Sequence, residues 1–236
     1  MSVFANLVEQ LAELLEPVFH ASAAAAAIVL FTALVRLLVH PLSRAAARGQ
    51  KARTELQPKI AELRKKHGRN PERLQQAVLE LHTKEKVSPL AGCLPGLLQL
   101  PAFFVLYHVF SNRTIGGEEN SLLGHRLLDA PLGHRWVDAL DDGGVFGAAG
   151  LVYVGLFAVV IAVATFNYRR SKRMTAAQAL PAGGGEQVPG IGAVVKVMPF
   201  ISFFTVVTVA VVPLAAALYV VTSTTWSAVE RAVLYR

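Results

Sequence analysis

Residues 17–39, PVFHASAAAAAIVLFTALVRLLV, decide the fold of this chain. A helix that crosses the hydrocarbon core of a bilayer needs about 20 mostly apolar residues, and this stretch meets that requirement. Within it, Arg36 is the only Lys, Arg, Asp or Glu. An arginine at the centre of a membrane helix costs roughly 2.5–3.5 kcal/mol on insertion scales. Such residues usually face a helix-bundle interior or a watery cavity, so Arg36 is the first candidate functional residue.

Two interpretations of Arg36 remain open from the residues alone. Because it lies a few residues before the end of the stretch, its long side chain could extend to the headgroups while its stem stays in lipid. Thr32, Arg36 and His40, however, recur at four-residue intervals and therefore share one helix face. A polar face of this kind favours a hydrated interior site.

Apolar segments continue through the rest of the chain. No charged residue occurs in residues 197–229, a stretch too long for one span, and Pro213 at its middle lacks the backbone donor that a helix interior needs. The chain is 53% hydrophobic and only 17% charged. We therefore predict an all-α integral membrane protein with five transmembrane helices, at residues 17–39, 87–110, 145–167, 193–210 and 212–229.

The connecting segments alternate in charge. Residues 1–16 contain three glutamates and no basic residue, and residues 111–144 are mainly acidic, whereas residues 40–86 and 168–192 are rich in Lys and Arg. Basic loops stay in the cytoplasm, so the first two segments are predicted outside and the last two inside, with residues 230–236 a cytoplasmic C-terminus. The net charge of +7 is explained in the same way, without nucleic-acid binding. No cleavable signal peptide is expected, because the first 16 residues lack Lys and Arg.

The cytoplasmic segment 40–86 has the pattern of two antiparallel helices. Apolar residues recur on one helical face in each half: Leu56, Ile60 and Leu63, then Leu74, Val78 and Leu81. Between them, Gly68 is suited to a helix C-terminus, Asn70 to an N-cap and Pro71 to a first turn. The alternative is a solvated basic loop.

Polar residues on the other predicted spans could form a hydrophilic hollow with the Arg36 face. The alternatives are ordinary polar contacts between helices and, for Trp226 and Tyr235, interfacial anchoring. The candidate lining residues are Arg36, Thr32, His40, Gln99, Ser202, Tyr219, Thr222 and Trp226.

Several function classes have no visible machinery in the sequence. No Asp or Glu lies inside a predicted span, which disfavours coupled transport. Cys93 is the single cysteine, so no disulfide or cysteine-based metal cage can form within the chain. His125 and His134, in two Gly-His-Arg repeats, are expected at the surface rather than at a metal, and the glycine-rich residues 182–190 are expected to be a linker. No enzyme activity, cofactor or metal is predicted.

Several motifs resemble the YidC/Oxa/Alb membrane protein insertases. The second predicted span contains Gly-Cys-Leu-Pro-Gly-Leu-Leu-Gln-Leu-Pro-Ala-Phe-Phe-Val-Leu-Tyr, at 92–107. The segment Val35–Leu42 is similar to the family's arginine-containing segment, and Met198–Phe200 and Pro213–Tyr219 resemble its last two spans. The chain lacks the large periplasmic domain of Gram-negative members and is similar to the five-span Gram-positive form. It departs from that form in having no lipidated cysteine and only Arg231 and Arg236 in a basic tail.

The resemblance implies a membrane protein insertase in a bacterial plasma membrane. It implies a hydrophilic groove open to cytoplasm and lipid, with Arg36 attracting acidic segments of a nascent protein before its apolar segment enters the bilayer. Expected partners are nascent membrane proteins and membrane lipids, with a ribosome and a Sec translocon as further expected partners. The short C-terminus weakens the case for ribosome docking. The alternatives are an anion or small-solute channel or transporter that binds at Arg36, and an assembly factor without a groove.

Overall fold

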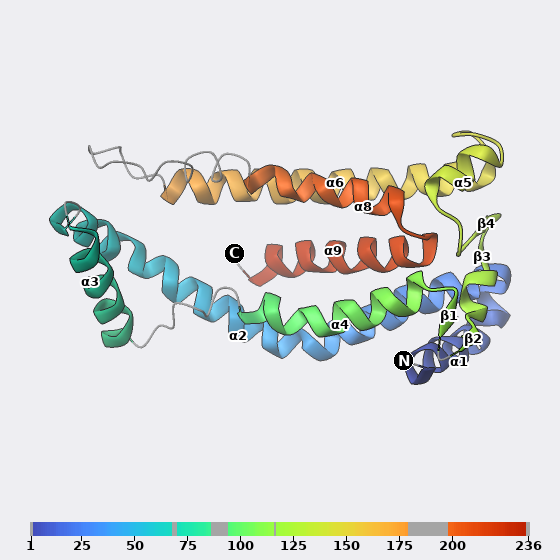
Figure 1. The fold of residues 1–236 in the computed structure, drawn as a ribbon, viewed down its shortest axis with the longest axis horizontal. Coiled ribbons are helices and arrows are strands. Elements are labelled where there is room, and N and C mark those ends of the chain that lie inside the picture. The colour runs from blue at the N-terminus through green and yellow to red at the C-terminus, as the bar shows by residue number, and fades with distance from the viewer. Residues whose placement is uncertain (1, 68–69, 86–93, 116, 179–197, 235–236) are drawn as a thin grey trace.

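The computed structural model describes residues 2–67, 70–85, 94–115, 117–178 and 198–234, and helices dominate them. Figure 1 shows their arrangement along the long axis of the molecule. The helices are α1 (Ser2–Phe19), α2 (Ala23–His67), α3 (Pro71–Lys84), α4 (Leu94–Ser111), α5 (Trp136–Asp141), α6 (Ala148–Gln178), α8 (Phe204–Val211) and α9 (Leu214–Leu234), with short 3-10 turns η1 (His20–Ser22), η2 (Ser121–Gly124) and η3 (Met198–Phe203).

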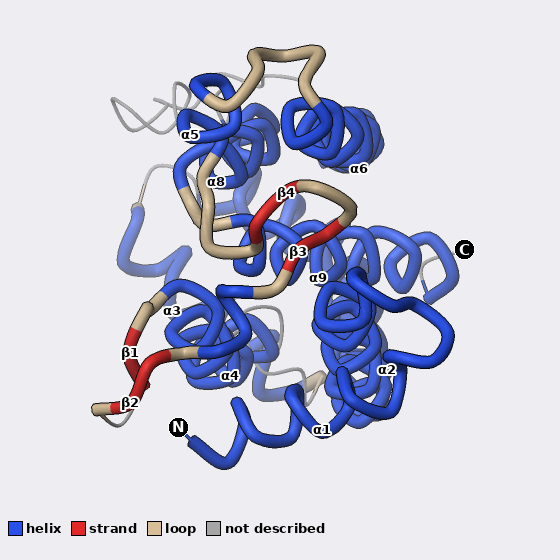
Figure 2. The backbone as a smooth tube through the Cα atoms, turned by 90° about the vertical axis from the view of Figure 1, so that its right-hand side faces the viewer, coloured by secondary structure: helices blue, strands red, loops and turns tan. Residues whose placement is uncertain are grey.

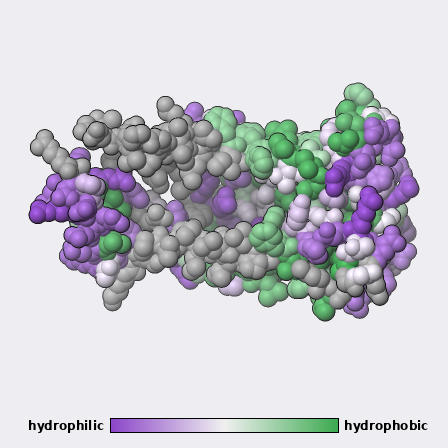
Figure 3. Space-filling model, in the orientation of Figure 1, coloured by the Kyte–Doolittle hydropathy of each residue, from purple (hydrophilic) through white to green (hydrophobic). Residues whose placement is uncertain are grey.

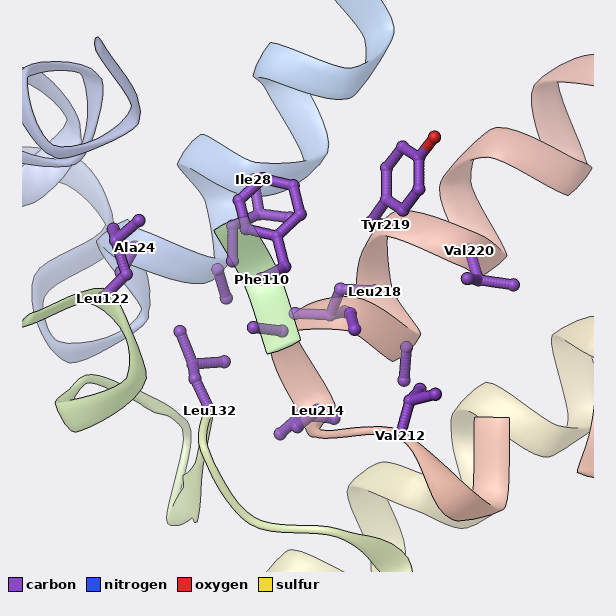
Figure 4. Packing of buried hydrophobic residues seen from close by; sticks show 14 of the residues in the cluster. Ala24, Ile28, Phe110, Leu122, Leu132, Val212, Leu214, Leu218, Tyr219 and Val220 are labelled. Atoms are coloured by element: carbon purple, nitrogen blue, oxygen red, sulfur yellow. The ribbon is translucent and has the colours of Figure 1, made fainter. Parts of the chain in front are cut away.

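Helix α9 lies at the centre of the molecule. Helices α6 and α8 lie on one side of it and α2 and α4 on the other, and the end-on view in Figure 2 shows the same order. Every residue of α9 from Leu214 to Val221 is buried, as are Ile28 of α2 and Phe110 of α4, which converge with it in Figure 4. The core therefore sits around the N-terminal half of α9.

Helix α2 runs without interruption from Ala23 to His67, through Pro41 and Pro58. We expected a span ending at residue 39 and a separate helix after it. A proline removes one hydrogen bond, and the strong helix formers around these two positions maintain the helix on both sides. At about 1.5 Å per residue, α2 is about twice as long as a hydrocarbon core is thick, so a large part of it must project beyond a bilayer.

The first predicted span, at residues 17–39, does not begin where a helix begins. Residues 17–19 still belong to α1, and the chain turns at His20, whose φ of 47° is in the left-handed region. The predicted segment 17–39 therefore straddles two helices. Helix α1 packs against the start of α2 through small residues, with Ala5, Ala12 and Ala24 all buried, and such residues allow close approach of helix backbones.

Helix α3 folds back against the C-terminal half of α2 (Figure 1). Asn70 caps it: its side-chain oxygen accepts a hydrogen bond from the Arg73 backbone N–H at 3.1 Å. On α2, the side chains of Leu56 and Ile60 are buried. Lys59 hydrogen-bonds Glu85 and thereby lowers the pKa of that carboxyl group, but the pair is exposed and adds little stability.

The connection between α4 and α6 closes one end of the molecule. It contains two small antiparallel pairs, β1 (Thr114–Ile115) with β2 (Glu118–Glu119) and β3 (Arg126–Leu127) with β4 (Ala130–Pro131), followed by α5. The carbonyls of His134 and Leu132 accept hydrogen bonds from the first two N–H groups of α9, at 2.8 and 2.9 Å. A helix leaves its first N–H groups without helical partners, so this segment satisfies donors that would otherwise be buried and unpaired.

The last two helices meet at a sharp turn. Helix α8 ends at Val211 and α9 begins at Leu214, so the chain reverses at Val212 and Pro213, where the sequence placed the turn. The glycine-rich segment 182–190 and the start of the predicted fourth span, residues 193–197, lie outside the described residues.

Apolar side chains cover much of the outer surface. Leu34, Leu38, Phe104, Ile161 and Val211 are all exposed, and Figure 3 shows a hydrophobic band between hydrophilic ends. Two described helical stretches, Val3–His67 and Ala148–Arg173, are long and apolar enough to cross a membrane. Only 33% and 22% of their most apolar portions are buried, unlike core helices of soluble proteins, which are mostly buried. Large exposed apolar surfaces of this kind mark contact with a membrane or with another protein.

We expect Leu132→Ala to lower the free energy of unfolding by about 2–5 kcal/mol, because Leu132 is fully buried against the start of α9 and its loss leaves a void. Thermal unfolding in detergent micelles would measure this. Leu151→Ala is the matched control, since Leu151 is 54% exposed on α6 and its truncation should change the free energy by only about 0.5 kcal/mol. Equal effects of the two variants would contradict the proposed packing.

Candidate functional site

Arg36 joins α2 to α9. Its Nη2 group donates hydrogen bonds to the Ser223 backbone carbonyl, at 3.0 Å, and to the Ser223 hydroxyl. Ser223 is buried and Arg36 half-buried, so the guanidinium extends from α2 into the bundle rather than away from it. These contacts favour the interior interpretation of Arg36 over extension to the headgroups.

A second polar pair lies one turn further along α2. His40 Nδ1 is 2.6 Å from Glu230 Oε1, and the Glu230 side chain is only 10% exposed. Both pairs advance in the same chain direction, so α2 and α9 run parallel. We refer to Arg36, His40, Ser223 and Glu230 as the Arg36 cluster.

Ser223 and Glu230 were missed from the sequence. Glu230 was placed just beyond the last predicted span, yet α9 continues to Leu234. Tyr219, Ser223, Trp226 and Glu230 recur at intervals of three or four residues, which places them on one helical face. That periodicity would have revealed both residues had it been followed through position 230.

Two of the predicted lining residues are enclosed by the protein. Thr32 is 1% exposed, and its hydroxyl donates to the Ile28 carbonyl of its own helix at 2.6 Å. Tyr219 is 2% exposed, with its ring centroid 6.0 Å from that of Phe103 and 5.9 Å from that of Phe110. Thr32 therefore has a structural partner, whereas Tyr219, one turn before Ser223, forms the inner wall beside Arg36.

The remaining candidate lining residues lie on three different elements. Thr222 and Trp226 are half-buried on α9, around Ser223. Ser202 is half-buried on η3, in the layer that contains α8. Gln99 belongs to α4, but its side chain lies outside the described residues.

Burial along α9 changes sharply at Thr222. Residues 214–221 are all buried, whereas Thr222 and residues 224–227 are half-buried. These half-buried residues include Thr224, Thr225 and Ser227, so the less enclosed half of the helix is also the polar half. Figure 3 shows the molecule hollowed between its layers on the side of the helix pair α2 and α3, with hydrophilic residues in view. The opposite end is closed by the α4–α6 connection.

The guanidinium keeps capacity to bind an anion. Among the described residues, all hydrogen bonds of Arg36 leave from Nη2, so its Nε and Nη1 donors have no partner there. Arginine presents its donors as a planar fork that matches a carboxylate. No group of three or more metal-binding side chains occurs among the residues that the structure describes. The arrangement is therefore suited to transient electrostatic binding.

The chain is similar to known membrane proteins. A family model described as 60Kd inner membrane protein matches residues 15–236. A relative named Membrane protein insertase YidC from Clostridium perfringens is 46% identical over 87 residues, which cover 37% of each chain. Relatives of the same name from Magnetococcus marinus and Shewanella woodyi are each 46% identical, over 35% and 36% of this chain and 15% of their own length. The aligned part thus spans well under two thirds of these relatives.

We expect a cysteine at Thr222 or Ser227 to react with a water-soluble maleimide, because both positions lie in the half-buried polar part of α9. A cysteine at Val207, 53% exposed on the apolar surface of α8, should react far more slowly, since a thiolate is disfavoured in lipid. Labelling of the protein in liposomes, with Cys93 replaced by Ser, would test this. A faster reaction at position 207 than at 222 and 227 would contradict a hydrated interior.

Proposed function

The chain belongs to the 60Kd inner membrane protein family, and from this premise we propose that it is a membrane protein insertase that passes apolar segments of nascent proteins into the lipid bilayer. The observation that carries the proposal is the half-buried Arg36, which is held by α9 beside a polar, partly exposed helix face and whose Nε and Nη1 donors have no partner among the described residues. The names of the relatives support the same activity.

We propose five spans in a bacterial inner membrane, with the N-terminus outside and the C-terminus in the cytoplasm. Support comes from the direction of the chain: α2, α4, α6, α8 and α9 alternate in direction along the long axis (Figure 1). Five alternating crossings would leave the basic segments 40–86 and 168–192 on one side and the acidic segment 111–144 on the other.

The polar half of α9 would line a groove that is open to the cytoplasm and to lipid. Its opposite end is closed by Leu132 and His134 of the α4–α6 connection, which cap α9. A short hydrophilic segment of a substrate, often acidic, would enter this groove and be attracted by Arg36. Because the groove ends within the membrane, the segment has less hydrocarbon left to cross.

The driving force would be hydrophobic. Burial of apolar surface is worth roughly 25 cal/mol per Å², so an apolar span of about 20 residues gains far more by entering lipid than a short polar segment loses during transfer. The exposed apolar side chains of α8 and α9, such as Phe204 and Val229, offer a surface along which such a span could slide. No nucleotide or cofactor is required.

The helix pair formed by the end of α2 and by α3 would receive the substrate in the cytoplasm. Its exposed face is basic, with Arg64, Lys65 and Lys66 at the end of α2. Contacts of this pair with a ribosome or a Sec translocon are further proposed partners. An anion channel or transporter is not favoured by the family.

Arg36→Ala should reduce insertion of a substrate with an acidic translocated segment by roughly threefold to tenfold, and Arg36→Lys should restore much of it if charge is what matters. Protease protection of a reporter protein in liposomes that contain the purified chain would measure the effect. Wild-type activity of Arg36→Ala on every substrate tested would remove the support for charge attraction.

Deletion of residues 50–84 removes the α2–α3 helix pair and should abolish most insertion while the remaining helices still assemble. The same reporter assay measures this, with near-ultraviolet circular dichroism as the test of assembly. Unchanged insertion by the deletion variant would exclude the helix pair as the receiving element.

A further inference from the structure

The Arg36 cluster contains one enclosed carboxylate, that of Glu230. Glu230 lies on α9 two turns after Ser223, and its side chain is 10% exposed. An enclosed carboxylate needs a charged or hydrogen-bonding partner, and His40 supplies one at 2.6 Å. Ser223, which holds Arg36, and the enclosed acid Glu230 thus lie on the same face of α9, two turns apart.

The position of Glu230 relative to Arg36 is set by His40. Its carboxylate is held at 2.6 Å by His40, one turn after Arg36 on α2, so its negative charge lies on the Arg36 side of that helix, whereas Arg231, the next residue on α9, is exposed. The C-terminal part of α9 thus carries one acid, which His40 holds, and one exposed base. Among the described residues, the hydrogen bonds of Arg36 go to Ser223, and that of Glu230 goes to His40, so the carboxylate lies one α2 turn away without occupying the guanidinium donors.

We propose that Glu230 is an internal competitor for Arg36 that sets the selectivity of the site between acidic and neutral substrate segments, and that His40 positions the Glu230 carboxylate. The inference rests on the proposed insertase function and names a specificity residue of that site. A substrate carboxylate that approaches Arg36 meets repulsion from Glu230, which limits how tightly the acidic segment is held. An uncharged segment has no such interaction.

Two substitutions act in opposite directions. Glu230→Gln keeps the size of the side chain and a hydrogen-bonding oxygen but removes the charge. The ratio of inserted acidic to neutral segments should therefore rise by on the order of threefold. His40→Ala removes the ring that holds the Glu230 carboxylate, which is then free to turn to Arg36. The ratio of inserted acidic to neutral segments should therefore fall by a similar factor. In the double variant the charge is absent, and its behaviour should match that of Glu230→Gln.

The experiment uses the full chain in liposomes of phosphatidylethanolamine and phosphatidylglycerol. Two reporter proteins share one apolar span and differ only in two residues of the translocated segment, Asp in one and Asn in the other. The measured quantity is the ratio of protease-protected acidic to neutral reporter. Glu13→Gln is the matched control, because Glu13 is exposed on α1, outside both the Arg36 cluster and the α2–α3 helix pair, and should leave the ratio at the wild-type value.

A purely structural role for Glu230 would lower both reporters together and leave the ratio unchanged, and that result overturns the inference. Glu230→Asp keeps the charge in a shorter side chain and should keep the ratio within about twofold of the wild-type value, so it provides a second test if the Gln variant is unstable. A rise with Glu230→Asp equal to that with Glu230→Gln also overturns it. If the wild-type chain inserts neither reporter, the proposed function itself fails and this inference falls with it.

Discussion

The structure depends on the burial of one half of a single helix. The first eight residues of α9 are enclosed by α2, α4, α6 and the α4–α6 connection, whose Leu132 and His134 carbonyls satisfy its first N–H groups. In lipid no water is present to take those hydrogen bonds, so an uncapped, buried helix end would cost several kcal/mol. Because this half of α9 fixes the bundle, the other half can remain partly open and polar.

The Arg36 cluster follows from the same arrangement. The parallel packing of α2 and α9 brings Arg36 to Ser223 and His40 to Glu230, across almost the full length of the chain. An arginine inside a membrane helix is tolerated when its charge and donors find partners within the protein. Here the serine supplies both acceptors, and the glutamate is held by His40 one turn further along α2.

Several elements could be predicted from the sequence because their determinants are local. Asn70 and Pro71 mark the start of α3, Pro213 interrupts the last apolar stretch, and the alternation of basic and acidic loops follows from charge alone. Local signals failed where they conflicted with neighbours. The predicted span end at residue 39 is not a helix end, because α2 continues through Pro41 and Pro58, and Pro17, the predicted start of that span, lies within α1.

The sequence by itself determined that the chain is helical and apolar enough to lie in a bilayer, and that Arg36 is out of place there, because these properties depend on composition and spacing within single segments. Which side chains meet Arg36 depended on the tertiary structure. Thr32 shares its helix face yet bonds its own backbone, whereas Ser223 and Glu230 reach the face of α2 from a helix about 190 residues away along the chain. Such contacts are set by the packing and direction of helices, which no local pattern encodes.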